Sequence, residues 1–519
     1  MKWLLLLFLT GTLYVEVSPK RILAFFPLIA KSHHYVFRPI IEELTKRGHE
    51  IVYVTGYAYE KGPPKGVTQI DIKKYLPFRE AEGNVTALIG ASAFDSTARF
   101  YKFGVKLSHM ILSSPPVKEL IHSKAKFDAV LMESYAVQEY QSAFIHKFGC
   151  VGIEIIPLGD FSWMNEIAGL PSNPSYQLDF KSEATQDMNF IQRLYNTYVV
   201  TITTLISYYQ QFEMQRIVDQ YFTYPGWETR PPLSQLLANR SLILSNSHFA
   251  IGYPSPLTSH RKEIGGVNIL PNKPLSKDLQ KYMDESTDGV IYFSLGSNIN
   301  VSDPLNEHIT QVFINTFREL PYKVLMKWEI EYTGTPPPPN VKLEKWFPQQ
   351  DILAHKNCIL FITHGGLLSL MEAVHFGVPV IGIPFFGDQA KNFFFAEEAG
   401  IGKMIRLEEI TYERVSNTIK EVLSNKSYKN EIMKKSKIFR DRPEEPVKTA
   451  VYWIEHAMKY PNVLTPKSAS LSYVQLHLLD VKLFLGTVLL TALYIIWKLL
   501  ASISRLFKGK PAVRKAKRS

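Results

Sequence analysis

Residues 346–392 hold the densest group of side chains that can do chemistry. The apolar run 359–362 ends in a Thr-His-Gly-Gly turn at 363–366, a helix-period pattern follows at 367–374, and a second apolar run covers 378–383. The order strand, turn, helix, strand places backbone amides and a helix N-terminus at the carboxyl end of a buried strand, where phosphate oxygens bind. The segment therefore predicts a phosphate-binding site.

The same segment carries side chains that suit the other parts of a nucleotide-sugar. Trp346 offers a flat indole face for a base. Glu372 is an acceptor for ribose hydroxyls, and Asp388 and Gln389 offer polar groups for a sugar. Because these side chains accompany the phosphate-binding turn, the arrangement predicts a site for a nucleotide-sugar.

This segment resembles the nucleotide-sugar signature of the UDP-glycosyltransferases, and its Gly-Gly-Leu-Leu-Ser-x-x-Glu-Ala stretch at 365–373 is most similar to insect-type members. The resemblance extends through the amino-terminal half and the C-terminal anchor. It implies an α/β fold of two doubly wound, Rossmann-like domains that face each other across a cleft, known as the glycosyltransferase B fold. It also implies transfer of a sugar from a UDP-sugar donor.

The resemblance assigns roles on the donor side. Trp346 is expected to stack on uracil, an interaction worth about 1–3 kcal/mol for a base on an aromatic ring, and Gln349 to bond the edge of the base. Glu372 is expected to bind the ribose, and Asp388 and Gln389 the sugar hydroxyls. The residues expected to face the diphosphate are Ser297, His364, Gly365 and Gly366.

One position departs from the family pattern. Many members place an asparagine four residues after the signature His364, where it touches phosphate, whereas this chain has Leu368 there, followed by Ser369. Phosphate contacts are therefore expected to depend on backbone amides and on Ser369 or Thr363. Insect-type members share this local pattern, so it does not predict an inactive protein.

A base for the acceptor hydroxyl is predicted after the first strand. His33 lies there at the carboxyl edge of the sheet, where open α/β folds bind ligands, and an imidazole titrates near neutral pH. In the family, a His in a Ser-His-aromatic setting is the base; here His34 fills the aromatic position, so the choice between the two imidazoles stays open. The family's orienting carboxylate corresponds to Glu133, at the end of the strand 127–132, while Asp128 is interpreted as structural.

Strand and helix patterns position these residues. The run 21–26 predicts a buried strand, 27–34 a loop, and the following residues an amphipathic helix closed by Gly48 before a strand at 49–55. This alternation predicts a parallel, doubly wound sheet. The second half of the chain shows a strand-to-turn unit at 289–297 and a proline-rich loop at 336–339. A helix at 447–457 is expected to cross back to the first domain.

Residues 183–222 are rich in Tyr, Phe and Ile, and a helix is predicted there. Such a region can line a pocket for an aromatic acceptor or lie against a bilayer, and core packing is the simplest interpretation for any one side chain. The aromatic residues concerned are Tyr195, Tyr198, Tyr208, Tyr209, Phe212, Tyr221 and Phe222.

Both ends of the chain have patterns typical of membrane targeting. Residues 1–18 combine one Lys with a short apolar core, as a signal peptide does, and 481–504 is long enough to span a bilayer. The tail 505–519 holds seven Lys or Arg and no acid, which predicts its cytosolic side. The tail also supplies most of the net charge of +11, so nothing indicates a nucleic-acid partner.

A single-pass type I protein of the endoplasmic reticulum membrane with a lumenal body is therefore expected. The final Lys-Ala-Lys-Arg-Ser is interpreted as a retrieval tail or as an extension of the basic anchor. The expected organisation begins with a signal peptide (1–18), an acceptor-binding domain (19–267) and a linker (268–278). A UDP-sugar-binding domain with a return helix (279–460) follows, and then a juxtamembrane segment (461–480), a transmembrane helix (481–504) and a tail (505–519).

Cysteine, glycosylation and metal patterns add constraints. Cys150 and Cys358 fall in different predicted domains, so free thiols are expected. The sequence has no Asp-x-Asp pair and no Cys/His cluster with metal-ligand spacing, so no metal and no cofactor besides the UDP-sugar co-substrate are predicted. The sequons open to glycosylation in a lumenal body are Asn84, Asn239, Asn300 and Asn425.

The resemblance and the residues together predict an inverting, UDP-sugar-dependent hexosyltransferase that acts on a hydroxyl of a small lipophilic acceptor, as in detoxification. Insect-type resemblance favours glucose, and glucuronate is the alternative. A glucuronate carboxylate is expected to need a cationic partner; Arg38 and Lys391 lie near candidate regions, but their presence does not decide between the two donors. Two other hypotheses are a non-catalytic binder of hydrophobic small molecules and a transferase for lipid-linked or protein acceptors. A homo-oligomer is neither predicted nor excluded.

Overall fold

The computed structural model describes residues 18–76, 93–135, 137–159, 162–179, 181–296, 307–329, 332 and 336–507. The core of the predicted signal peptide, the diphosphate candidate Ser297, the sequons at Asn84 and Asn300 and most of the basic tail lie outside the described residues.

The first domain is built on a sheet of parallel strands in the order β3-β2-β1-β4-β5-β6-β7. Side chains of β1 alternate between two apolar cores, with Leu23 and Phe25 in one and Ile22 and Ala24 in the other. The sheet is thus buried on both faces, as its near-continuous apolar strands predict. The strands are β1 Arg21–Phe26, β2 Glu50–Thr55, β3 Val67–Asp71, β4 Ala129–Met132, β5 Val151–Ile156, β6 Leu242–Ser245 and β7 Arg261–Glu263.

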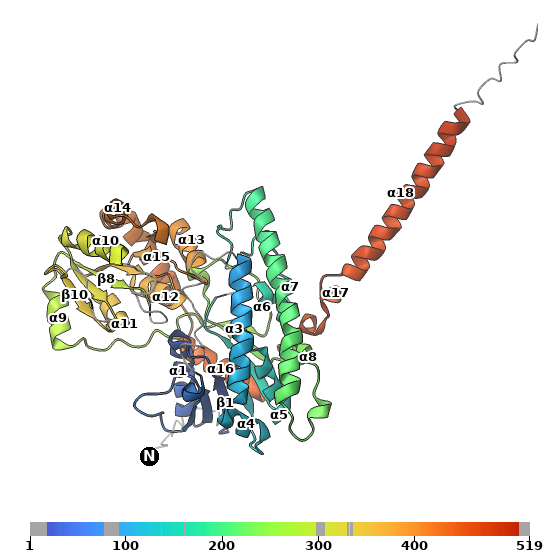
Figure 1. Cartoon of the computed structure of the whole chain (residues 1–519), viewed down its shortest axis with the longest axis horizontal. Coiled ribbons are helices and arrows are strands. Elements are labelled where there is room, and N and C mark those ends of the chain that lie inside the picture. Colours follow the sequence, from blue (N-terminus) through green and yellow to red (C-terminus); the bar gives the residue numbers. More distant parts are fainter. Residues whose placement is uncertain are drawn as a thin grey trace, which may run out of the picture.

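Helices pack on both faces of this sheet (Figure 1). They are α1 Lys31–Lys46, α3 Ala93–Ser113, α4 Pro115–His122, α5 Ala143–Phe148, α6 Ser162–Ile167, α7 Phe190–Tyr221 and α8 Leu233–Ala238. The predicted helix at 183–222 begins only at Phe190, because Asn189 caps it and forms a capping box with Gln192.

The second domain contains another all-parallel sheet, in the order β10-β9-β8-β11-β12-β13. Its strands are β8 Val290–Ser294, β9 Lys323–Lys327, β10 Val341–Glu344, β11 Cys358–Thr363, β12 Val380–Gly382 and β13 Gly402–Met404. Its helices are α9 Lys277–Asp284, α10 Glu307–Arg318, α11 Gln349–Leu353, α12 Leu367–Phe376, α13 Gln389–Glu398, α14 Tyr412–Ser424 and α15 Lys426–Arg440. The two predicted doubly wound domains are therefore present.

The helix predicted to cross back to the first domain is α16, Pro446–Lys459. Its residues Ala450, Val451 and Ile454 are buried in the core that also holds α1. Glu455 adds an ion pair with Arg47 at 2.9 Å. The chain thus returns to the first domain through α16. Cys150 and Cys358 are free thiols, as expected from their separate domains.

The loop predicted at 27–34 is wrong at its C-terminal end, because α1 begins at Lys31. Nothing in residues 31–34 breaks a helix, and Val36 and Phe37 bury the same helix against the sheet. His33 therefore lies in the first turn of a helix, and its backbone is fixed more firmly than a loop would fix it.

The C-terminal helix α18, Leu479–Phe507, is long and apolar enough to cross a membrane, and it projects away from both domains (Figure 1). The segment before it, which includes α17 at Tyr473–Leu476, is tied to the first domain. His477 Nε2 lies 2.8 Å from Glu166 Oε2, and the rings of Tyr473 and Tyr208 pack edge to face. The anchor thus emerges beside α7.

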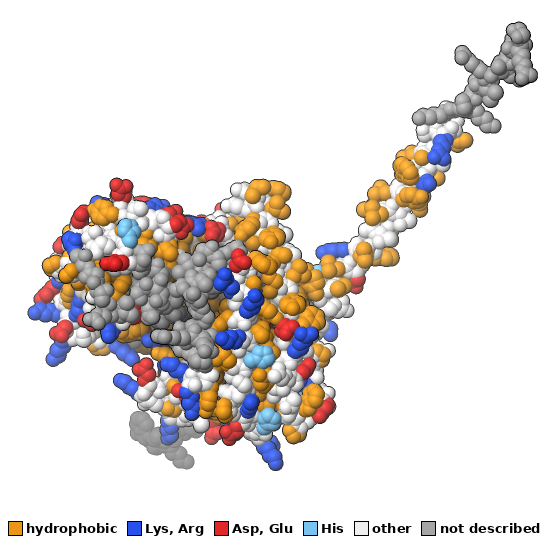
Figure 2. Space-filling view, viewed as in Figure 1, with side chains coloured by type: hydrophobic (Ala, Val, Ile, Leu, Met, Phe, Trp, Pro, Cys, Tyr) orange, Lys and Arg blue, Asp and Glu red, His pale blue; other side chains and the backbone are white. Residues whose placement is uncertain are grey.

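The interpretation of the aromatic residues on α7 as core is wrong for most of them. Phe222 is fully buried, but Tyr195, Tyr198, Tyr209 and Phe212 are exposed on the outer side of α7. The space-filling view shows hydrophobic side chains along this helix (Figure 2). They leave the core because α7 extends past the sheet and packs against it through other residues, such as Met214, Ile217 and Val218.

Candidate active site in the interdomain cleft

Both sheets bring their candidate residues to the position where the strand order reverses. In the first sheet this position lies between β1 and β4, and His33 and Glu133 follow those two strands. In the second sheet it lies between β8 and β11, which are followed by Gly296 and His364. Loops leave such neighbouring strands in opposite directions, which opens a crevice at their carboxyl ends.

The predicted base and carboxylate are in contact. His33 Nδ1 is hydrogen-bonded to Oε1 of Glu133, whose side chain is fully buried, while the His33 side chain is 13% exposed. Gln141 fixes the backbone of Glu133 from both sides, since its Oε1 accepts from the Glu133 amide and its Nε2 donates to the Glu133 carbonyl, both at 3.1 Å. With Nδ1 engaged, only Nε2 of His33 is available to a substrate proton.

His34 does not compete for this role. Its ring is buried, with Nδ1 2.6 Å from the hydroxyl of Tyr53 and Nε2 2.7 Å from the carbonyl oxygen of Leu28. Burial lowers the pKa of His34 to about 3. Both nitrogens are used inside the protein, which favours His33 of the two imidazoles that the sequence left open.

Asp128 lies at the opposite end of β4 from Glu133. Its carboxylate accepts from Lys20 Nζ at 3.0 Å and from the Arg21 amide at 2.9 Å. These contacts join the amino ends of β1 and β4, far from the crevice, which agrees with the interpretation of Asp128 as structural.

The carboxylate of Glu372 is the centre of a polar network on α12. It is buried and accepts from Gln349 Nε2 at 2.7 Å, from Gln350 Nε2 at 3.0 Å and from Asn268 Nδ2 at 2.9 Å. Ser369 accepts a second bond from Gln349 at 3.1 Å. Burial raises the pKa of Glu372, while these donors oppose that effect.

Sequence analysis missed Gln350 and Asn268. Gln350 directly follows a recognised candidate, so the Gln-Gln pair was a usable signal. Asn268 offered none, because it belongs to the predicted linker and reaches Glu372 only through the fold.

His364 forms the floor of the predicted diphosphate site. Its ring lies so close to Gly296 and Gly366 that a Cβ on either glycine would come within 3 Å of it. Burial lowers the pKa of His364 to about 4, so the ring is neutral near pH 7. The helix α12 begins directly afterwards, and no side chain caps its first amides. These amides are donors for an anion.

Lys327 is a further cation at this position that sequence analysis missed. It ends β9 and is buried, its Nζ donates to the carbonyl oxygen of Gly296, and it pairs with Glu329. Its charge contributes to the lowered pKa of His364. A single Lys at the end of an apolar strand gives little signal in a sequence, but here its Nζ contacts the turn that follows β8.

The predicted sugar-binding residues differ in what they present. Asp388 Oδ2 accepts from Asn392 Nδ2 at 2.9 Å, and the same Nδ2 lies 2.9 Å from the Gly365 carbonyl oxygen. Burial raises the pKa of Asp388, while the hydrogen bond from Asn392 opposes that effect. Gln389 turns Oε1 to the amides of 385 and 386, which leaves its Nε2 as the group for a sugar.

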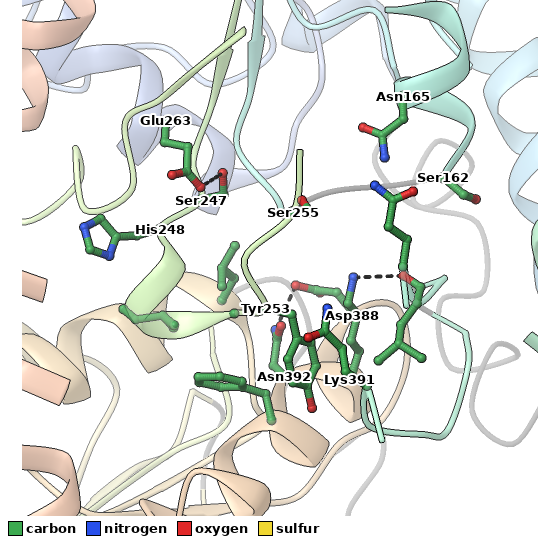
Figure 3. A pocket seen from close by; sticks show the side chains of 18 of the residues that line it. Ser162, Asn165, Ser247, His248, Tyr253, Ser255, Glu263, Asp388, Lys391 and Asn392 are labelled. Atoms are coloured by element: carbon green, nitrogen blue, oxygen red, sulfur yellow. Dashed lines mark hydrogen bonds between the residues drawn. The ribbon is translucent and has the colours of Figure 1, made fainter. Parts of the chain in front are cut away.

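A pocket lies between the domains next to Asp388 (Figure 3). Pocket lining was one of the interpretations open for the aromatic residues of 183–222, and none of them contributes to this pocket. Its labelled polar residues are Ser162, Asn165, Ser247, His248, Tyr253, Ser255 and Glu263 from the first domain, and Asp388, just before α13, with Lys391 and Asn392 on that helix.

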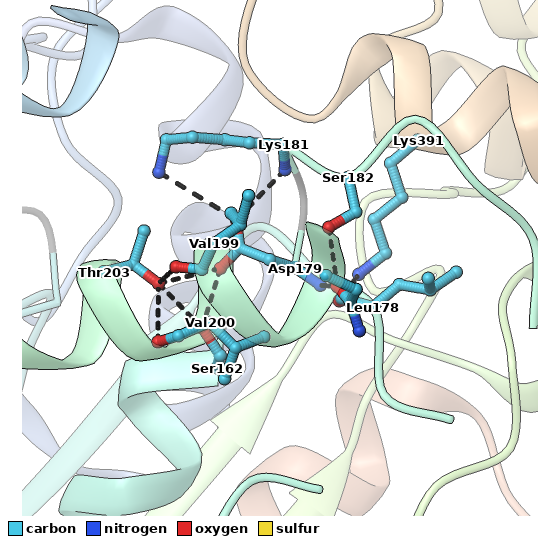
Figure 4. Close-up of polar contacts among 10 residues, drawn as sticks. Ser162, Leu178, Asp179, Lys181, Ser182, Val199, Val200, Thr203 and Lys391 are labelled. Atoms are coloured by element: carbon cyan, nitrogen blue, oxygen red, sulfur yellow. Dashed lines mark hydrogen bonds and ion pairs between the residues drawn. The ribbon is translucent and has the colours of Figure 1, made fainter. Parts of the chain in front are cut away.

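One wall of the pocket is organised by Asp179. Its buried carboxylate accepts from Ser162 Oγ at 2.7 Å and from Thr203 Oγ1 at 3.3 Å, which ties the segment before α7 to α6 and α7 (Figure 4). Lys391 reaches across from the second domain and donates to the carbonyl of Leu178 at 3.3 Å. Both domains therefore shape this wall.

Within the described parts of the chain, no three His, Cys, Asp or Glu side chains converge as metal ligands would. The positive groups at the crevice of the second sheet are instead Lys327 and the first amides of α12.

Sequence comparison finds similar proteins over nearly the whole chain. The family model "UDP-glucoronosyl and UDP-glucosyl transferase" matches residues 25–514. UDP-glucosyltransferase 2 of Dactylopius coccus is 34% identical over 493 residues, which cover 93% of each chain. UDP-glucuronosyltransferase 1A1 of Mus musculus is 31% identical over 527 residues, which cover 94% of this chain and 92% of the relative.

Solved structures give the same picture of the fold. The glycotransferase of kitacinnamycin superposes with a TM-score of 0.57 at 16% identity, covering 85% of this chain and 100% of that one. UDP-glucose: anthocyanidin 3-O-glucosyltransferase in complex with UDP gives a TM-score of 0.55 at 15% identity, covering 85% and 99%. At these identities the likeness is one of fold alone.

Proposed function

The chain belongs to the UDP-glucuronosyl and UDP-glucosyl transferase family, has the glycosyltransferase B fold and is a UDP-sugar glycosyltransferase; from this premise we propose that it transfers glucose to a hydroxyl of a small lipophilic acceptor with inversion at the sugar. The observation that carries the proposal is the hydrogen bond between His33 and Glu133 at the position where the strand order of the first sheet reverses.

We assign donor binding to the second domain. Uracil stacks on the half-exposed Trp346, and Glu372, held by its three amide donors, takes the ribose hydroxyls. The diphosphate lies against the first amides of α12 and near the ammonium of Lys327. Charge that develops on the departing UDP is stabilised there without reorganisation of the protein.

The proton of the acceptor goes to His33. Its Nδ1–H donates to Glu133, which holds the ring in one tautomer and stabilises the imidazolium that forms. As Nε2 takes the proton, the acceptor oxygen bonds to C1 of the sugar and the bond from C1 to the UDP oxygen breaks. Attack from the side opposite UDP inverts the configuration, and Asp388 holds the sugar hydroxyls during this step.

Glucose rather than glucuronate is supported by the positions of two cations. Arg38 donates through Nη2 to the carbonyl oxygens of Tyr57 and Ala58 at 2.7 and 2.8 Å. Lys391 contacts the carbonyl of Leu178. Both cations considered for a glucuronate carboxylate are therefore engaged with backbone, and the residue that faces the sugar is the acid Asp388.

We also propose that the body is lumenal in the endoplasmic reticulum and anchored by α18 as a single-pass type I protein. The apolar length of α18 and its basic C-terminal flank support this. Protease protection of the body in intact microsomes, with cleavage restricted to the tail, is the expected result; a digested body would contradict it.

The function is tested by expression of the full chain in microsomes with UDP-glucose and UDP-glucuronate in parallel and a panel of small phenols. Glucoside formed faster than glucuronide, and lost in His33→Ala, supports the proposal. A chain that binds phenols but forms no glycoside with either donor would instead be a binder of hydrophobic molecules. Glucuronide as the main product would overturn the donor assignment.

A further inference from the structure

Lys31 of the first domain covers Trp346 of the second. Its Nζ lies 3.8 Å from the centroid of the indole, and the rings of Tyr57 and Tyr35 are 5.9 and 6.0 Å from the same Nζ. The ammonium thus sits among three aromatic rings contributed by both domains. Burial and the neighbouring charge of Lys327 lower the pKa of Lys31.

The side of Trp346 that Lys31 covers is turned to the first domain. Lys31 is the first residue of α1 and reaches the indole from the opposite domain. A base entering between the domains meets the indole on this side.

The distances do not allow both groups on that face. Stacked rings make contact at about 3.5–4.0 Å, the ordinary separation of carbon atoms, and Nζ already occupies this layer. We propose that Lys31 occupies the uracil subsite when no donor is bound, and that the base must displace its ammonium to stack on Trp346.

The inference rests on the proposed role of Trp346 as the uracil platform and gives Lys31 a role in setting donor affinity. Lys31 touches no reacting atom, so it is not a catalytic residue. It shares the first turn of α1 with His33, and its contact with Trp346 therefore joins the helix of the base to the donor domain.

Calorimetric titration of the detergent-solubilised full chain with uridine tests the proposal. Uridine lacks the diphosphate, so the charge of Lys31 cannot attract it, and only competition for the indole face remains. We expect Lys31→Ala to bind uridine about two- to fivefold more tightly, the range of one cation–π contact at a partly exposed site. Lys31→Arg, which keeps the contact, is expected to bind uridine no more tightly than the parent.

Lys262→Ala is the matched control. Lys262 also lies over an indole, with Nζ 4.1 Å from the ring centroid of Trp453, but this contact joins β7 to α16 inside the first domain. Its removal should leave uridine affinity unchanged. Unchanged or weaker uridine binding in Lys31→Ala would overturn the proposal.

Trp346→Ala separates failure of this inference from failure of the proposed donor site. If Trp346→Ala binds UDP as well as the parent, the indole is not the uracil platform and both ideas fail. If Trp346→Ala loses UDP affinity while Lys31→Ala leaves uridine binding unchanged, the donor site stands and the inference about Lys31 alone is wrong.

Discussion

His33 Nδ1 and Glu133 Oε1 are hydrogen-bonded although 100 residues separate them in the sequence. They meet because β1 and β4 are neighbours at the point where the strand order of the first sheet reverses. The second sheet repeats the relationship with Gly296 and His364, which follow β8 and β11. Topology alone thus assembles both halves of the cleft.

Replacing the base should slow the reaction without weakening the donor. We expect His33→Ala to lower kcat by about 10²- to 10⁴-fold, the usual worth of a general base, with UDP affinity unchanged because donor binding is proposed for the second domain. Steady-state rates and UDP titration measure the two effects. His34→Ala is the comparison, since its buried ring bonds inside the protein and its loss should lower Tm. Full activity in His33→Ala would rule out the assigned base.

The carboxylate that orients His33 can be tested by a matched pair on one strand. Glu133→Gln keeps the shape but cannot stabilise the imidazolium, so we expect kcat to fall by roughly 10²- to 10⁴-fold. Asp128→Asn, at the other end of β4, should lose the contact with Lys20 and affect stability only. The pH dependence of kcat distinguishes the two, since only Glu133→Gln should alter it. Equal rates in Glu133→Gln and the parent would end the dyad.

Glu372 should control donor affinity. Glu372→Gln replaces a charged acceptor by an amide and disturbs the bonds from Gln349, Gln350 and Asn268. A hydrogen bond to a charged group is worth about 1.5–3 kcal/mol, so the KM for UDP-sugar should rise by about 10- to 100-fold. Glu413→Gln, on the exposed side of α14, is the control. A donor KM that stays at the parent value would exclude Glu372 from the ribose site.

Much of the fold was predictable because its patterns are local. The apolar run 21–26 became β1, and the signature at 359–374 became β11, its turn and α12. The exact start of α1 was not predictable, because residues 31–34 carry no breaker and are polar enough to suit a loop. Contacts such as Asn268 with Glu372 depend on how α12 meets the segment after β7, and no local pattern records that.

The aromatic residues on α7 show why burial is hard to predict from composition. A helix rich in Tyr and Phe usually packs inside a protein. Here the buried side of α7 is made by smaller residues such as Val199, Thr203 and Val218, while Tyr198 and Phe212 are exposed. The helix reaches past the sheet, so its exposed length follows from tertiary structure and not from its residue types.

Activity should survive removal of divalent cations. The sequence has no Asp-x-Asp pair, and Lys327 with the first amides of α12 supplies positive charge where the diphosphate is proposed to bind. We expect the rate in EDTA to stay within about twofold of the untreated rate, because this charge belongs to the protein. Lys327→Met should then lower kcat in both conditions. A large loss in EDTA that Mn²⁺ or Mg²⁺ restores would contradict the prediction.

A buried acid behind the site makes the stability of the protein depend on pH. Glu139 is 2% exposed, and burial raises the pKa of its carboxyl to about 8 from an ordinary 4.5. Below the ordinary pKa both the folded and the unfolded chain carry the proton, and the stability due to protonation is fully present. It is lost as the pH rises towards 8, because the unfolded chain releases the proton first.

Glu139→Gln places a neutral group of similar shape at this position. The stability of the variant should therefore not fall between the ordinary pKa of 4.5 and the raised pKa of about 8. We expect the Tm of the variant to match the parent near pH 5 and to exceed it at pH 8.5 by several degrees, since 1 kcal/mol shifts Tm by about 2–4 °C in domains of this size. Other buried acids, such as Glu372 and Asp388, shift in the same direction but are common to both proteins and cancel in the difference. Glu119→Gln, at an exposed position of α4, should follow the parent at every pH. Parallel Tm curves for Glu139→Gln and the parent would show that Glu139 is ionised in the folded protein.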